Sequence, residues 1–325
     1  MTNLFITWAA DPELFEIFGL SIRWYGLLFA LGFVFGYLII KRIFERENVP
    51  LKVLDSLTMY MVIGTVVGAR LGHCFFYEPQ YYLNHPFQIL NLRQGGLASH
   101  GSAIGILVSL YLFSRKHKKS FLWTVDRIVI VVALAGALIR TGNFMNSEIV
   151  GSFSNSPVAV MFENTPAWSH QGVQRISDYN SLSPEKKGIT EEFLKKNKAI
   201  LPENLGFYSL SIYLNLSEDL KKIYLKKQNI PRYPSQLFEA IACLLIFGLL
   251  FFLYFKRKGG ERPGYLLGLF LILIFGFRFF VEFIKDAQVD FEMSMALNMG
   301  QILSIPFVLT GIWLVYRSMS KPKLI

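Results

Sequence analysis

Charged residues are scarce in this chain of 325 residues. They make up 17% of it, compared with about 25% in a typical soluble domain. Hydrophobic residues make up 53%, a composition typical of a polytopic membrane protein. The net charge of +10 is not gathered on one basic face interleaved with aromatic residues, which argues against nucleic acid as a partner. Basic loops beside anionic lipid head groups account for that charge.

Cysteine and histidine are also rare, with two and five residues. Cys74 and Cys243 lie inside apolar runs and have neither metal-ligand spacing nor an evident disulfide partner. No set of His, Cys, Asp and Glu residues shows convincing metal spacing. The sequence therefore predicts no metal site and no cofactor.

The first residues also lack the pattern expected of a signal peptide, and no internal repeat is evident. The first 22 residues contain three acidic and no basic side chains, which is not the pattern of a secretory signal peptide. The absence of an internal repeat disfavours the many transporter folds that are built from repeats.

Long apolar runs, by contrast, are abundant. Runs of about 18 or more largely apolar residues predict transmembrane helices, and seven are found. The predicted fold class is an all-α polytopic membrane protein, with residues 1–325 in a single transmembrane domain. The seven runs cover residues 24–44, 53–77, 95–113, 127–145, 236–255, 264–283 and 299–316.

Basic residues alternate between the loops. Clusters follow the first, third, fifth and seventh runs, whereas the short loops after the second and sixth runs have only Arg93 and Lys285. This alternation predicts that the N-terminus lies outside and the C-terminus in the cytoplasm. Residues 152–233 then form a long periplasmic loop or small subdomain between the fourth and fifth runs, because long loops cross regardless of their charge.

Polar residues recur at one depth of these helices. The helix rise of about 1.5 Å per residue places seven of them, from six helices, in the outer third of a bilayer core of about 30 Å. A charge at membrane depth costs several kcal/mol unless it meets partners or water. We therefore expect a shared polar cavity with an anionic ligand. The seven residues are Tyr25, Arg70, His100, Arg140, Gln236, Glu239 and Arg278.

Structural interpretations compete with this one. Arg278 and Glu282 are four residues apart and could neutralise each other as a closed pair. Arg70 could anchor a loop carbonyl, and Tyr25 could belong to an interfacial aromatic belt. His100 could be a polar residue at a helix start.

The most informative motif lies at residues 140–151. It reads R-x-G-N-F-M-N-x-E-x-x-G and resembles the signature of the prolipoprotein diacylglyceryl transferase family. Five other segments resemble motifs of that family in the same order, so the resemblance covers residues 20–316 apart from the long loop. These segments are IRWYGL at 22–27, GARLG at 68–72, GGLASHG at 95–101, PRYPSQLFEA at 231–240 and GFRFFVEF at 276–283.

The chain departs from the family pattern at two places. Ile139 stands where the family usually has glycine before the signature arginine. The segment 175–230 is longer than the common loop of the family, and the resemblance implies no role for it.

The resemblance implies a membrane transferase whose single transmembrane domain is catalytic. Members of the family move the diacylglyceryl group of phosphatidylglycerol to the lipobox cysteine thiol of a prolipoprotein signal peptide, which yields a thioether and glycerol phosphate. The implied location is the bacterial cytoplasmic (inner) membrane, with the active site toward the periplasm. The implied partners are phosphatidylglycerol, prolipoprotein signal peptides and membrane lipids.

The residue types fit this chemistry. A thiol attacks as the thiolate, and His100 is suited to accept its proton, although an arginine or a water could mediate the step. Arginine can hold a phosphate with its planar fork, so we expect Arg140 to bind the head group and Arg278 to stabilise the leaving phosphate. The other expected head-group contacts are Asn143, Asn146, Tyr25 and Gln236, and the expected orienting residues are Glu148, Glu239, Glu282 and Arg70.

Two other functions compete with the transferase. An anion transporter or channel would use the same arginines, but the inner halves of the spans, such as 128–137 and 240–250, have few polar side chains. A non-catalytic scaffold that binds a partner through the long loop would leave the arginines at membrane depth unexplained.

Overall fold

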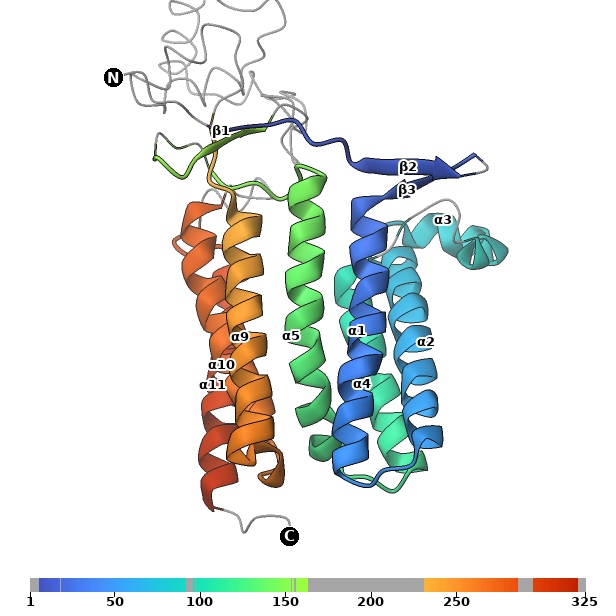
Figure 1. Ribbon diagram of the computed structural model, residues 1–325. Coiled ribbons are helices and arrows are strands. Elements are labelled where there is room, and N and C mark those ends of the chain that lie inside the picture. Colours follow the sequence, from blue (N-terminus) through green and yellow to red (C-terminus); the bar gives the residue numbers. More distant parts are fainter. Residues whose placement is uncertain are drawn as a thin grey trace, which may run out of the picture. The chain divides into compact units, whose positions relative to one another are not determined.

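Helices dominate the protein (Figure 1). The computed structural model describes residues 6–17, 19–91, 96, 98–152, 154, 156–162, 231–285 and 295–320. The long helices are α1 (Trp24–Arg46), α2 (Leu51–Phe76), α4 (Ser99–Lys116), α5 (Phe121–Met145), α9 (Ser235–Arg257), α10 (Tyr265–Val281) and α11 (Met299–Ser320). The short ones are α3 (Pro79–Asn84) and the 3-10 turns η1 (Pro86–Leu90), η4 (Gly259–Glu261) and η5 (Glu282–Ile284).

Within the described ranges, six helices are long and apolar enough to cross a membrane. They are α1, α2, α5, α9, α11 and the continuous stretch Tyr265–Ile284 that contains α10. The prediction of a mostly helical, multi-pass membrane protein is thereby confirmed. α4 coincides with the remaining predicted run, but polar residues occupy both of its ends. The count of seven spans and their orientation stay predictions.

Among the described residues, four short strands accompany the helices. β1 (Ile6–Trp8) pairs in parallel with β4 (Val160–Phe162), and β2 (Glu13–Ile17) pairs antiparallel with β3 (Leu20–Arg23). Two-stranded sheets of this size need packing against another element to be stable. For β1 that element is the end of α5, because the ring of Trp8 lies 4.3 Å from the ring of Phe144 and its indole N–H donates to the Phe144 carbonyl at 3.1 Å.

The chain divides into two compact units. The first unit comprises Met1–Ala30, Gly136–Leu244 and Ile274–Val308, and the second comprises Leu31–Ala135, Leu245–Leu273 and Leu309–Ile325. Helices α1, α5, α9, α10 and α11 contribute residues to both units. The units are described separately below.

In the second unit, α2 and α4 lie side by side (Figure 1). Gly64, Gly68 and Gly72 recur at one-turn intervals along α2 and face Gly101 and Gly105 of α4. A Cβ atom built on Gly68 would lie 2.5 Å from the carbonyl oxygen of Gly101, so the backbones approach too closely for any side chain. Small residues at this spacing allow membrane helices to pack closely.

A buried polar cluster in the second unit joins α1, α5 and α9. The Glu47 carboxylate, just after α1, accepts hydrogen bonds from the Arg127 guanidinium (2.6 Å from Nη2), from the Trp123 indole (3.0 Å) and from the Tyr254 hydroxyl. The Arg127 side chain is 5% exposed. Its charge is therefore compensated inside the protein, which holds the three helices at fixed positions within this unit.

In the first unit, the two ends of the long insertion meet. The Gly151 N–H donates to the carbonyl of Tyr233 at 2.8 Å, and Val160 and Arg232 exchange two backbone hydrogen bonds of 2.9 Å. The segment that follows α5 and the segment that precedes α9 are therefore hydrogen-bonded to each other. The rest of the loop or subdomain predicted at 152–233 lies mainly outside the described residues.

Candidate functional site

Arg140 lies near the end of α5, and its guanidinium contacts the side chains of two described residues of the first unit. Its Nε is 2.9 Å from Oε2 of Glu239, near the start of α9, and its Nη1 donates to Oδ1 of Asn143 at 3.5 Å. Asn143 follows one helical turn later, so the spacing in the motif places the amide beside the guanidinium. These two neighbours fix the orientation of Arg140.

Glu148 lies in the turn that follows α5. Its carboxylate accepts hydrogen bonds from the side-chain amides of Asn143 (3.4 Å) and Asn146 (3.2 Å), and its backbone carbonyl accepts one from the Gln236 amide. In the same turn Ile149 has a φ of 54°, a conformation that β-branched residues rarely adopt. Such strain persists only where the surroundings hold it, and it is common at functional sites.

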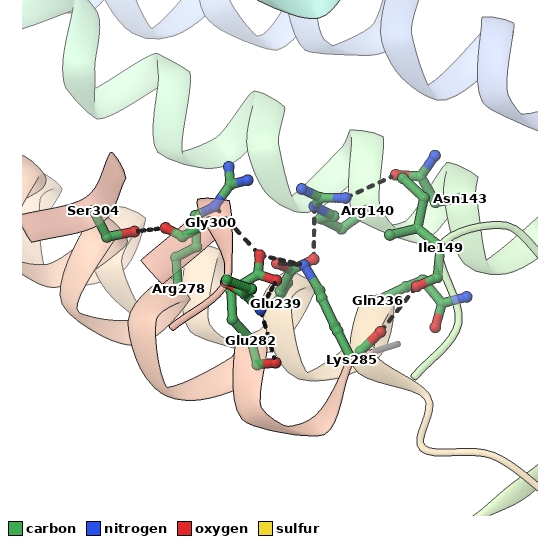
Figure 2. A network of polar contacts seen from close by, with 12 residues as sticks. Arg140, Asn143, Ile149, Gln236, Glu239, Arg278, Glu282, Lys285, Gly300 and Ser304 are labelled. Atoms are coloured by element: carbon green, nitrogen blue, oxygen red, sulfur yellow. Dashed lines mark hydrogen bonds and ion pairs between the residues drawn. The ribbon is translucent and has the colours of Figure 1, made fainter. Parts of the chain in front are cut away.

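Arg278 lies near the end of α10, and ion pairs connect it with Arg140. Its Nε is 3.5 Å from Oε1 of Glu282, which begins η5. The Nζ of Lys285 is 3.3 Å from the same Glu282 oxygen and 2.8 Å from Oε1 of Glu239. An unbroken series of ion pairs therefore runs from Arg140 to Arg278 (Figure 2). We call these five residues the ion-pair network.

Burial differs between the members of the network. The side chains of Glu239 and Glu282 are each 8% exposed and that of Lys285 is 4% exposed, whereas those of Arg140 and Arg278 are 24% and 43% exposed. Both arginines meet the carboxylates through Nε, and Figure 2 shows their terminal nitrogens on the side away from the carboxylates. Planar guanidinium forks bind phosphate well, so the network can hold an anion with buried acids behind the arginines.

Tyr25 packs beside the signature motif in the same unit. It is the second residue of α1, and a Cβ atom built on Gly142 would lie 3.1 Å from its Cα and its Cδ2. The glycine of the motif therefore allows α1 and α5 to approach at this level, and it places Tyr25 beside the helical turn of Arg140 and Asn143.

Contacts within the first unit thus connect nine of the eleven predicted site residues. The amide groups of Asn143 and Asn146, expected to contact a head group, donate to Glu148. The binding and catalytic roles of all nine stay predictions. The nine are Tyr25, Arg140, Asn143, Asn146, Glu148, Gln236, Glu239, Arg278 and Glu282.

Arg70 belongs to the second unit and is 3% exposed. It donates to the backbone carbonyls of Gln88 at 2.6 Å and of Ile89 at 2.8 Å, and its guanidinium lies 5.1 Å from the centre of the Tyr82 ring. These contacts favour the interpretation of Arg70 as an anchor for backbone carbonyls, here those of η1, the 3-10 turn that follows α3.

His100 also belongs to the second unit and is the second residue of α4. Its exposed ring lies 5.1 Å from the ring of Phe76, in an edge-on arrangement, and 5.8 Å from that of Tyr77. Its role as a base stays a prediction.

Two residues of the site did not emerge from the sequence as candidates. In the sequence, Lys285 counts only as a basic residue of the loop after the sixth apolar run. In the structure it contacts both buried acids of the network. Asn298 donates from its amide to Oε2 of Glu282 at 3.3 Å. The three-residue spacing between Glu282 and Lys285 was the one local signal that could have identified the lysine.

Comparison with known proteins agrees with these motifs. The family model described as prolipoprotein diacylglyceryl transferase matches residues 12–317. A relative from Tolumonas auensis, named phosphatidylglycerol–prolipoprotein diacylglyceryl transferase, is 38% identical over 312 residues, which are 96% of this chain and 96% of the relative. Relatives of the same name from Chloroherpeton thalassium and Porphyromonas gingivalis are 36% and 38% identical; they cover 99% and 98% of this chain and 98% and 96% of their own lengths.

Proposed function

Because the chain belongs to the prolipoprotein diacylglyceryl transferase family, we propose that it transfers the diacylglyceryl group of phosphatidylglycerol to the lipobox cysteine of prolipoprotein signal peptides. This transfer is the first step of bacterial lipoprotein maturation. The names of the relatives state phosphatidylglycerol and prolipoprotein as substrates, which supports both assignments. The alternating basic loops support an orientation with the site toward the periplasm, and membership of the family supports a location in the cytoplasmic (inner) membrane.

The reaction is an alkyl transfer to sulfur. The thiolate of the substrate attacks the glyceryl carbon that carries the phosphate ester. A carbon–sulfur bond forms, the carbon–oxygen bond breaks, and the oxygen leaves with the electron pair as glycerol phosphate. The thiol proton passes to a base. Because the substrate supplies the nucleophile, the enzyme needs no reactive cysteine or serine of its own.

The ion-pair network is the observation that carries this proposal. Arg140 binds the phosphate of the head group, and Arg278 stabilises the charge that the leaving oxygen acquires. Such stabilisation is strong where water is excluded and the donors are already oriented. Glu239 and Glu282 supply that orientation, since each is buried and contacts the Nε of one arginine.

The remaining site residues act around this pair of arginines. Gln236 has a buried Oε1 for which the described structure holds no hydrogen-bond donor, and a glycerol hydroxyl of the head group can supply one. Tyr25, Asn143 and Asn146 are further head-group contacts. His100 accepts the thiol proton, an assignment that rests on its residue type and on the family motif.

Reconstitution tests this function directly. The purified protein is placed in liposomes with phosphatidylglycerol labelled in its acyl chains and a synthetic lipobox peptide. The expected product is a peptide that carries the label through a thioether. A peptide with serine in place of the lipobox cysteine is the control and should stay unlabelled. Movement of anions across the liposome membrane without any labelled peptide would overturn the proposal in favour of a transporter.

A further inference from the structure

Lys285 lies buried between the two acids of the ion-pair network. Its Nζ contacts Oε1 of Glu239 at 2.8 Å and Oε1 of Glu282 at 3.3 Å, and its side chain is 4% exposed. Burial of an ammonium group is costly unless it is paired, and the two carboxylates compensate that cost. Lys285 is therefore the member that connects the Arg140 half of the network with the Arg278 half.

The backbone fixes Lys285 at this place. It follows η5 directly, and it forms an antiparallel bridge with Gly151, the last glycine of the signature motif. The N–H of Ser152 donates to the carbonyl of Ile284 at 2.8 Å. A Cβ atom built on Gly151 would lie 2.7 Å from that same carbonyl oxygen. The glycine thus lets the segment that carries Lys285 approach the turn after α5.

The charges of the network do not cancel. Three cationic side chains contact two carboxylates, so the network has one positive charge in excess. The nearby carboxylate of Glu148 is held separately by two side-chain amides. A phosphodiester carries a single negative charge and would balance the network. Without Lys285, the two arginines would face two carboxylates with no excess.

We propose that Lys285 is a positioning residue of the phosphate site. By sharing Glu239 and Glu282, it keeps those carboxylates away from the terminal nitrogens of Arg140 and Arg278, so that N–H groups of both arginines can bind a phosphodiester. This inference rests on the proposed function, which makes phosphatidylglycerol the ligand.

Three single variants and one double variant test it. The single variants are Lys285→Met, which removes the charge, Lys285→Arg, which keeps it, and Lys256→Met, a matched control at an exposed position of α9. The detergent-solubilised proteins are titrated with short-chain phosphatidylglycerol, and KM and kcat are measured with a lipobox peptide. We expect Lys285→Met to raise the Kd and KM for the lipid about tenfold, the effect of losing one unit charge near the phosphate. The KM for the peptide should not change.

The conservative and compensating variants separate charge from packing. Lys285→Arg should restore the Kd to within about threefold of the parent. The double variant Lys285→Met/Glu282→Gln removes a cation together with a carboxylate, and it should bind the lipid more tightly than Lys285→Met alone. An unchanged Kd in Lys285→Met, or equal losses in Lys285→Met and Lys285→Arg, would overturn the proposal. Because the titration needs no turnover, a parent protein that binds the lipid but forms no thioether would refute the proposed function and leave the lysine test valid.

Discussion

Replacement of Arg140 by lysine tests whether the geometry of the guanidinium matters beyond its charge. In the structure, Nε of Arg140 is 2.9 Å from Glu239 and Nη1 donates to Asn143 at 3.5 Å. A guanidinium can keep both contacts while another N–H meets a phosphate oxygen, because its donors are spread over a rigid plane. The lysine ammonium is a single nitrogen on a flexible stem and cannot reach all three partners in that arrangement.

The expected loss follows from the contacts. The substitution removes at least one charge-assisted hydrogen bond, and each is worth about 1.5–3 kcal/mol. Since about 1.4 kcal/mol corresponds to a factor of ten, kcat/KM for phosphatidylglycerol should fall by about 10- to 100-fold. Arg140→Gln also removes the charge that balances Glu239, so its loss should be larger than that of Arg140→Lys.

The assay is thioether formation in liposomes, with the lipid concentration varied at a saturating concentration of lipobox peptide. Arg257→Lys is the matched control, because Arg257 is exposed at the end of α9 and should tolerate the exchange. Thermal unfolding of each variant in detergent distinguishes loss of function from loss of fold. If Arg140→Lys kept more than about a third of the parent kcat/KM, this would refute the idea that the guanidinium contacts Glu239, Asn143 and the phosphate at the same time.

Three further predictions concern other parts of the chain. Glu47→Gln leaves the buried Arg127 without a counter-charge and should lower the unfolding free energy by about 3–5 kcal/mol in denaturant titrations. The same exchange at the exposed Glu45 should change the unfolding free energy little. Equal unfolding free energies for the two variants would contradict a stabilising role of the Glu47–Arg127 pair. Gly68→Ala introduces a Cβ atom 2.5 Å from a backbone oxygen of α4, so it should destabilise the protein by about 1–3 kcal/mol, measured by the same titration. His100→Gln should reduce the rate of thioether formation about 100-fold or more at neutral pH while the Kd for the lipid stays constant; undiminished turnover would exclude this histidine as the base.

The transmembrane helices could be predicted because their signal is local. The run predicted at 236–255 corresponds to α9, Ser235–Arg257, and the run at 24–44 corresponds to α1, Trp24–Arg46. A span needs about 20 apolar residues and satisfies its backbone hydrogen bonds internally, so neither length nor identity depends on distant parts of the chain.

The strands could not be predicted for the opposite reason. β1 and β4 have three residues each and pair across more than 150 positions of sequence. No alternating pattern can be recognised in three residues, and the contact that supports β1 joins Trp8 to Phe144, which lies 136 positions away.

In the candidate site, local sequence spacing predicts some contacts but not others. The four-residue interval between Arg278 and Glu282 indicates an ion pair but fits a closed pair and an open site equally well. The structure contains two observations that favour the open site. The Nε of Arg278 lies 3.5 Å from Glu282 while the side chain is 43% exposed, and Glu282 also contacts Lys285. The contact between Lys285 and Glu239 bridges 46 positions and depends on α9 lying beside the end of η5. A distant partner of this kind decides whether a buried carboxylate pairs with one cation or with two. An isolated sequence motif therefore cannot reveal which N–H groups of an arginine are available to a ligand.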